Sequence, residues 1–228
     1  LGPDAESVAL AWRFPGLASK DFEVLQVVSQ VLYNGKAGLI DLDLNQQQKV
    51  LNSYGYPMGL ADYSAFILGG LPKQGQTLEE VKDLLLNEIK KLRAGEFDEK
   101  MLQANINNFK LYELQSMESN EGRADIFVNS FINGTNWEDE VTAIDRMAKL
   151  TKEDIVAFAD KYLKEDNYAV VYKKQGKDPN EKKMTKPEIT PIVSNRDVAS
   201  PFLTSIQENA VKPIEPVFLD FKKDMSQL

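Results

Sequence analysis

The order of predicted elements along the chain places this protein in the α+β class. A strand is followed by two helices, two adjacent strands, a run of helices and a final strand. The chain has 228 residues, of which 43% are hydrophobic and 27% are charged. At this length, folding buries roughly 70% of the surface that the unfolded chain exposes. The sequence can therefore build a substantial core.

The first predicted elements are a buried strand and an amphipathic helix. Val8 to Phe14 is an apolar run that stops at Pro15-Gly16, which is typical of a strand inside a sheet. Ser19 then caps a helix that continues to about Tyr33, with its apolar residues on one stripe. A short second helix is expected after this one.

Two strand candidates, Tyr54 to Leu60 and Ser64 to Leu71, follow with only a short connection between them. They predict a hairpin. Thr77 and Glu80 have the spacing of a capping box, which opens the next helix. Tyr168 to Tyr172 is the last predicted strand. The helices predicted between the hairpin and this strand span residues 77–95, 98–120, 121–132, 136–147 and 151–163.

The chain changes character after Lys173. We expect residues 1–173 to form one domain and residues 174–228 to form an extended linker that leads into the next domain. Recurrent prolines in the second part forbid regular helix and favour extended chain. Val217 to Phe221 is expected to begin a strand of another domain.

Histidine and cysteine are both absent from the sequence. These side chains are common zinc ligands, and they supply many of the proton shuttles and nucleophiles that work near neutral pH. Any chemistry would have to come from other side chains or from another polypeptide segment. The sequence Asp41-x-Asp43-x-Asn45 resembles the start of a calcium loop, but the required Gly and Glu are missing, so a solvated helix surface is the preferred interpretation.

The formal charge of −8 argues against nucleic acid as a partner, because nucleic-acid-binding proteins carry a basic face. No apolar run is long enough for a membrane span. The chain opens on Leu1-Gly2-Pro3 without a Met, which indicates a piece of a longer protein. Without cysteine, the sequence leaves both periplasm and cytoplasm open as compartments.

Several segments together resemble the pitrilysin/insulinase family of zinc metallopeptidases, over about Ser7 to Lys173. The resemblance implies a mostly antiparallel sheet packed against several helices, followed by an extended proline-rich linker. Lys186-Pro187 and the residues after it resemble the connection between the two halves of such enzymes. The segments that carry the resemblance are Val8-Ala-Leu-Ala-Trp-Arg-Phe-Pro15, Ser64-Ala-Phe-Ile-Leu-Gly-Gly70, Leu150-Thr-Lys-Glu-Asp154 and Tyr168-Ala-Val-Val171.

In that family several copies of one domain enclose the substrate, and only one copy carries the zinc motif H-x-x-E-H. The resemblance therefore implies that this chain is a non-catalytic copy with no metal of its own, and that the parent protein holds zinc in another domain. A further copy supplies an Arg and a Tyr near the stretch that corresponds to Leu39 to Tyr56, but this chain has no arginine there. The second position, directly after the zinc domain, fits better.

The leading hypothesis is a non-catalytic domain of a zinc metalloendopeptidase that helps form the substrate chamber and supports the zinc-bearing domain. Its partners would be the other domains and a peptide substrate. The alternative is a pure interaction or scaffold protein of the same fold, such as a core-type subunit of a respiratory complex. A third hypothesis, an unrelated enzyme that uses carboxylates, has no poised acid–base pair to support it.

The resemblance also points to a substrate-binding strand, or exosite, formed by Ala65, Phe66, Ile67 and Leu68. In insulinase-like enzymes the domain after the zinc domain pairs with substrate backbone at an open sheet edge, and this strand corresponds to that one. The alternative interpretation is an ordinary sheet strand with Phe66 and Leu68 in the core. The sequence favours neither interpretation.

Overall fold

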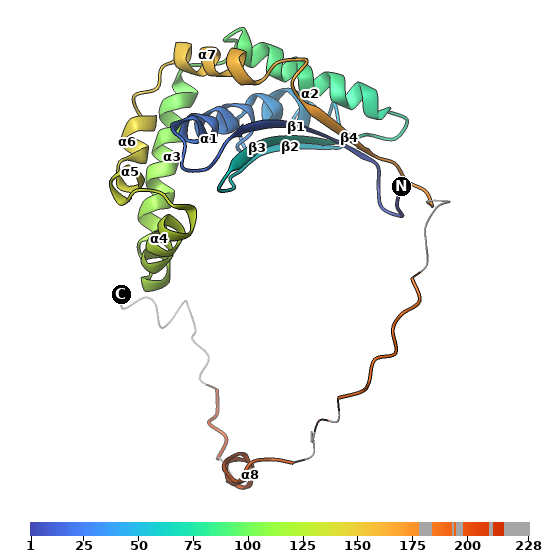
Figure 1. Ribbon diagram of the computed structural model, residues 1–228, viewed down its shortest axis with the longest axis vertical. Coiled ribbons are helices and arrows are strands. Elements are labelled where there is room, and N and C mark those ends of the chain that lie inside the picture. The colour runs from blue at the N-terminus through green and yellow to red at the C-terminus, as the bar shows by residue number, and fades with distance from the viewer. Residues whose placement is uncertain (178–183, 193, 195–197, 210–211, 217–228) are drawn as a thin grey trace. The chain divides into compact units, whose positions relative to one another are not determined.

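The computed structural model describes residues 1–177, 184–192, 194, 198–209 and 212–216. Its contacts divide the chain into two units, Leu1–Glu181 and Lys182–Leu228. The predicted boundary after residue 173 stays a prediction. In the first unit, four strands form one sheet in the order β2-β3-β1-β4 (Figure 1). The strands are β1 (Ser7–Pro15), β2 (Asn52–Met58), β3 (Tyr63–Leu71) and β4 (Ala169–Lys173).

All neighbouring strands in this sheet are antiparallel. The central strand β1 places Trp12 opposite Phe66 of β3 and Ala11 opposite Ala169 of β4. β2 and β3 form the predicted hairpin. The α+β class with a mostly antiparallel sheet is therefore confirmed.

Helices α1, α2 and α7 lie over one face of this sheet (Figure 1). The predicted cap at Ser19 is confirmed, and Thr77 and Thr151 each form a full capping box. Caps of this kind each contribute about 1 kcal/mol to the free energy of unfolding. The helices of the first unit are α1 (Lys20–Leu32), the π-helical turn η1 (Asp41–Asn45), α2 (Leu78–Arg93), α3 (Lys100–Ser116), α4 (Asn120–Asn133), α5 (Trp137–Val141), α6 (Ala143–Met147) and α7 (Lys152–Tyr162).

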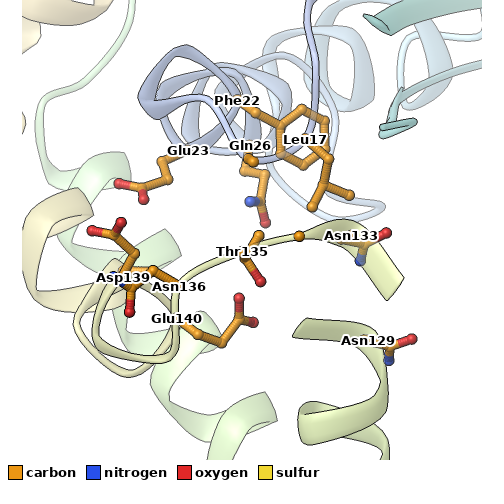
Figure 2. A pocket seen from close by; sticks show the side chains of 13 residues that line it. Leu17, Phe22, Glu23, Gln26, Asn129, Asn133, Thr135, Asn136, Asp139 and Glu140 are labelled. Atoms are coloured by element: carbon orange, nitrogen blue, oxygen red, sulfur yellow. The ribbon is translucent and has the colours of Figure 1, made fainter. Parts of the chain in front are cut away.

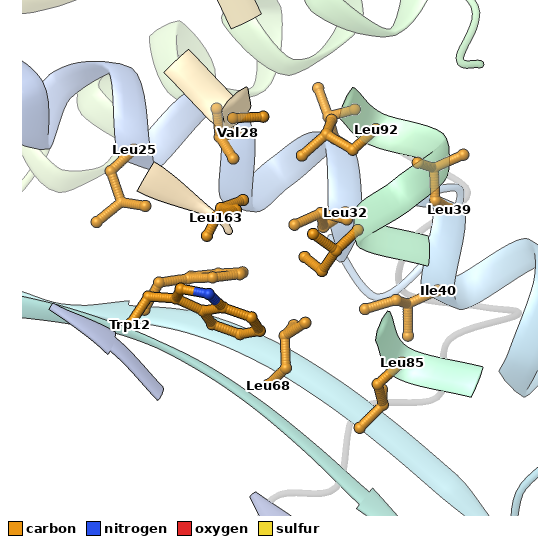
Figure 3. Close-up of a cluster of buried hydrophobic side chains, with 14 of the residues drawn as sticks. Trp12, Leu25, Val28, Leu32, Leu39, Ile40, Leu68, Leu85, Leu92 and Leu163 are labelled. Atoms are coloured by element: carbon orange, nitrogen blue, oxygen red, sulfur yellow. The ribbon is translucent and has the colours of Figure 1, made fainter. Parts of the chain in front are cut away.

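The hydrophobic core lies between the sheet and these helices (Figure 3). Side chains alternate along β1, so Val8, Leu10, Trp12 and Phe14 all point into the core. The indole Nε1 of Trp12 donates a hydrogen bond to the carbonyl oxygen of Lys164 at 3.1 Å, which satisfies its polar atom. Full burial of a side chain of this size contributes roughly 3 kcal/mol.

One predicted helix is interrupted. The single helix expected over residues 136–147 is wrong, because the structure has two short helices, α5 and α6, that meet at Thr142. Thr142 has φ −109° and ψ 2°, outside the helical region. Its hydroxyl donates to the carbonyl oxygen of Glu138 at 2.6 Å. Such a local side-chain bond competes with helix continuation.

The second unit contains the helix α8 (Pro201–Glu208). The expectation that prolines exclude regular helix from this part of the chain is therefore wrong. Pro201 occupies the first turn, where a missing N–H costs nothing, and the Ser200 side chain accepts a hydrogen bond from the backbone N–H of Leu203. The strand expected at Val217 to Phe221 lies outside the described residues.

Candidate functional site

The predicted exosite residues lie in β3, between β2 and β1. Phe66 and Leu68 are fully buried in the core, whereas Ala65 and Ile67 are half-buried on the opposite face of the sheet. Because β3 is paired along both sides, its backbone has no free edge. The expected open edge at this strand is therefore wrong. Contact between these residues and a peptide stays a prediction.

The sheet ends in β2 on one side, and this edge is partly blocked. The side-chain amide of Asn45 donates to the carbonyl oxygen of Ser53 at 2.8 Å and accepts from the Ser53 N–H at 2.8 Å. Ser53 thus points its backbone groups away from β3, and by the two-residue alternation so do Gly55 and Pro57. Pro57 has no N–H to offer. Main-chain pairing of a peptide along β2 is therefore disfavoured.

The face of the sheet that points away from α1, α2 and α7 is largely apolar, and we call it the open face. Its centre includes small residues: Ala9 of β1 pairs with Gly69 of β3, and Ala11 pairs with Ile67 of β3 and Ala169 of β4. The Arg13 guanidinium lies 4.7 Å from the ring centre of Tyr63 at one margin. Larger apolar side chains are well exposed on this face: Tyr56 46%, Met58 40%, Tyr63 57% and Val171 64%.

The Asp41-x-Asp43-x-Asn45 segment has a structural role. Asp41 is 4% exposed and accepts hydrogen bonds from the backbone N–H groups of Asn34 at 2.9 Å and Gly38 at 3.0 Å. The expectation of a solvated helix surface is therefore wrong for this residue. Its carboxylate closes the loop after α1 by satisfying two buried backbone donors.

An ion triad with one buried carboxylate links α2 to η1. The Lys91 ammonium lies 2.5 Å from a carboxylate oxygen of Asp43 and 2.9 Å from one of Glu88, which is 1% exposed. Burial raises the pKa of Glu88, against the opposing effect of Lys91. A hydrogen bond from Lys91 lowers the pKa of Asp43. These contacts tie α2 to η1, which is a structural role.

Sequence reasoning missed Glu88, although its position held a signal. It lies three residues after Leu85 and four before Leu92, on the buried stripe of α2. It also missed Asn45 as an edge-blocking residue. Within the described ranges, no group of three or more His, Cys, Asp or Glu side chains is placed to hold a metal ion. None of the described helices is long and apolar enough to cross a membrane.

Comparison with known proteins shows which families and structures this chain resembles. The family model described as the peptidase M16 inactive domain matches residues 2–109. A curated relative, zinc protease PqqE of Helicobacter pylori, is 27% identical over 178 residues, which are 76% of this chain and 39% of the relative. The chain thus spans well under half of the length of that relative.

Solved structures share the same architecture. A protease from Helicobacter pylori has a TM-score of 0.70 at 22% identity, over 75% of this chain and 42% of that one. The inactive peptidase domain of a putative zinc protease from Bordetella parapertussis has a TM-score of 0.68 at 17% identity, over 78% of this chain and 97% of that one. A chain of complex III₂ from Candida albicans has a TM-score of 0.61 at 9% identity. The match covers 75% of this chain and 44% of that one.

The chain shares an antiparallel sheet covered by helices with these structures, and it contains no His or Cys. The family match over residues 2–109, just under half of the chain, and the likeness to a curated zinc protease both support a non-catalytic domain of the M16, or pitrilysin/insulinase, peptidase family. The resemblance predicted from the sequence is confirmed.

Proposed function

We propose that this chain is a non-catalytic domain of a zinc metalloendopeptidase, helps form the substrate chamber and supports the zinc-bearing domain. The open face carries this proposal. A domain that completes its own core and still exposes an apolar sheet face gains stability when another domain covers that face. The likeness to a curated zinc protease supports a peptidase as the parent protein, with its zinc in another domain.

The exosite residues fit this proposal through their side chains. Ala65 and Ile67 would contact a peptide or a neighbouring domain on the open face, while Phe66 and Leu68 hold the strand on the core. Main-chain pairing would instead use β4, which within the described residues pairs with β1 alone among the strands. An edge strand of this kind gives affinity without demanding a particular sequence.

The test introduces a charge at the centre of the open face of the intact protein and measures peptidase activity. Ala11 lies between Ile67 and Ala169 on the neighbouring strands. We expect Ala11→Glu to lower peptidase activity of the intact protein at least tenfold, because a charge would be buried against the partner domain (roughly 2–5 kcal/mol). The same substitution should leave the circular dichroism spectrum of this chain unchanged.

Ala157→Glu is the matched control. Ala157 is exposed on α7, on the helical side of the domain, and Glu is compatible with a helix there. Activity of the intact Ala157→Glu protein should equal that of wild type. If the Ala11→Glu protein is as active as this control, the open face has no supporting role and the proposal is rejected.

The scaffold alternative has the same fold, and the likeness to a complex III₂ chain at 9% identity shows the fold alone. The sequence of the intact protein separates the two functions. An H-x-x-E-H motif upstream of Leu1 would favour the peptidase, and a parent protein without that motif would favour the scaffold.

A further inference from the structure

Two adjacent pockets on the α3–α4–α5 side of the first unit share one residue, Glu140. The first, which we call the polar pocket, has a volume of about 450 Å³ and lies between α1 and the α4–α5 connection. The second, the apolar groove, has a volume of about 560 Å³ and lies between α3, α4 and α5. Both volumes fall in the range of ligand-binding sites.

The apolar groove is built from exposed aromatic side chains. The rings of Phe127 and Trp137 stack with their centres 4.4 Å apart, and these side chains are 59% and 43% exposed. Tyr112 and Val141 line the same groove and are 61% and 49% exposed. Stacked aromatic rings that stay open to water gain free energy when an apolar side chain covers them.

The polar pocket is rich in amides. Its walls include the side chains of Gln26 on α1, Asn129 on α4 and Asn133 at the end of α4. Figure 2 shows Gln26 and Glu140 approaching the same space from opposite sides of the pocket. Amide and carboxylate oxygens accept hydrogen bonds, so together these groups favour a ligand that donates several.

Other acidic side chains of the polar pocket are already neutralised. Arg146 donates to both carboxylate oxygens of Glu23, at 2.9 and 2.5 Å. Lys20 lies 2.5 Å from Asp139. These pairs hold α1 against α5 and α6. They leave Glu140 as the carboxylate of this pocket that is available to a ligand.

The cation of the apolar groove is also occupied. Arg123 donates to the carbonyl oxygen of Met117 at 2.7 Å and to the side chain of Asn120 at 2.5 Å. By contrast, the carboxylates of Glu113 and Glu140 have no hydrogen bond or ion pair within the part of the chain that the structure describes. The partners of Arg123 are neutral, so Arg123 keeps its charge, but the two carboxylates outnumber it and the apolar groove has a net negative charge.

We propose that the two pockets together bind a peptide segment in which an apolar or aromatic residue adjoins a lysine or arginine. The apolar side chain fills the groove beside Phe127 and Trp137. The cation enters the polar pocket, where it pairs with Glu140 and donates to Gln26. The negative charge disfavours nucleic acid and anionic membranes as occupants. The residues that line this site come from α1, α3, α4, α5 and their connections, and none of them belongs to the open face.

The test is fluorescence anisotropy of a labelled ten-residue unstructured peptide that contains a Phe-Lys pair, titrated with this chain. A second peptide replaces Lys by Glu, and a third replaces Phe by Ser. We expect the first peptide to bind, and each of the other two to bind at least fivefold more weakly. Trp137 provides a second readout, because its fluorescence changes when the groove fills, while Trp12 stays buried.

Two carboxylate variants give the matched comparison. Glu140→Gln should weaken binding about two- to fivefold, the range of a partly exposed ion pair. Glu138→Gln makes the same charge change on α5 at a residue that lines neither pocket, and should leave the affinity unchanged. Phe127→Ala should weaken binding about tenfold through the lost apolar contact.

Three results would overturn the proposal. One is the absence of binding by the Phe-Lys peptide at millimolar chain. Another is an equal loss of affinity in Glu138→Gln and Glu140→Gln, which would show only general attraction to an acidic surface. The third is equal or tighter binding of anionic lipid vesicles or of the charge-reversed peptide.

Discussion

Helices α1 and α4 of the first unit differ in how far their apolar residues are buried. In α1 more than half of the residues are buried, whereas Ser130 is the buried residue of α4. α4 instead exposes Phe131 at 88% and Ile132 at 68%. Most of the core comes from the sheet, α1, α2 and α7, with Leu102 and Ile106 of α3 added, while α4 and α5 present apolar surface outward. Folding of this domain therefore depends on one side, and recognition can use the other.

The largest expected difference between the two sides is in the cost of truncating an apolar side chain. Leu25→Ala in α1 should lower the free energy of unfolding by about 3 kcal/mol, because Leu25 is fully buried and its removal leaves a cavity. Phe131→Ala in α4 should change it by less than about 0.5 kcal/mol. Urea denaturation followed by circular dichroism measures both. Similar losses in the two variants would show that α4 packs as tightly as α1.

A smaller loss of stability is expected when the side-chain amide of Asn45 is removed. Asn45 makes three hydrogen bonds with Ser53, to its carbonyl oxygen, its N–H and its hydroxyl, each 2.8 Å long. Asn45→Ala should cost about 2 kcal/mol, because Ser53 is fully buried and would lose its partners. It should also free the β2 edge and promote association, which light scattering detects.

Asn129→Ala on the helical side is the control for this change. Asn129 is exposed and lines the polar pocket. Its truncation should leave both stability and light scattering at the wild-type level. If Asn129→Ala destabilises the chain as much as Asn45→Ala, the exposed amide of Asn129 contributes as much to stability as the hydrogen-bonded amide of Asn45, which would contradict the account.

The Lys91–Glu88–Asp43 triad predicts that stability depends on pH. Because burial raises the pKa of Glu88 in the folded state, the folded chain holds that proton more tightly than the unfolded chain. The contribution of Glu88 is greatest below the pKa of the unfolded chain and is lost as the pH rises through the folded-state pKa. Asp43 acts in the opposite sense, because its lowered pKa stabilises the fold above the ordinary value and loses that effect on acidification.

Glu88→Gln should therefore reduce the loss of stability that wild type shows as the pH rises above about 4. Urea denaturation between pH 4 and pH 8 gives both profiles. Identical profiles for wild type and Glu88→Gln would mean that Glu88 is solvated in the folded chain.

Local signals in the sequence located most elements of this fold. Helix starts could be predicted at Ser19, Thr77 and Thr151, because capping depends on neighbouring backbone groups. The hairpin could be predicted from two strands that are adjacent in the sequence. The break at Thr142 was missed because a single hydroxyl bond decides it. The helix at Pro201 was missed because proline disfavours helix interiors but not first turns.

The candidate site depended on contacts between distant residues, and there the sequence was less informative. One of the two interpretations of β3 had Phe66 and Leu68 in the core, where the structure has them, but strand order is set by pairing with β1, far away in the chain. The burial of Asp41 likewise comes from backbone donors that a loop brings to it. The pockets around Glu140 join α1, α3, α4 and α5, so no single stretch of sequence encodes them.

The most direct test of the central claim, that this chain is a non-catalytic domain, is a cleavage assay with the purified chain, zinc and an unfolded polypeptide. The chain has no His or Cys to supply the zinc site of a peptidase. We expect no cleavage above a buffer control. Proteolysis by the purified chain that a chelator abolishes would contradict the claim.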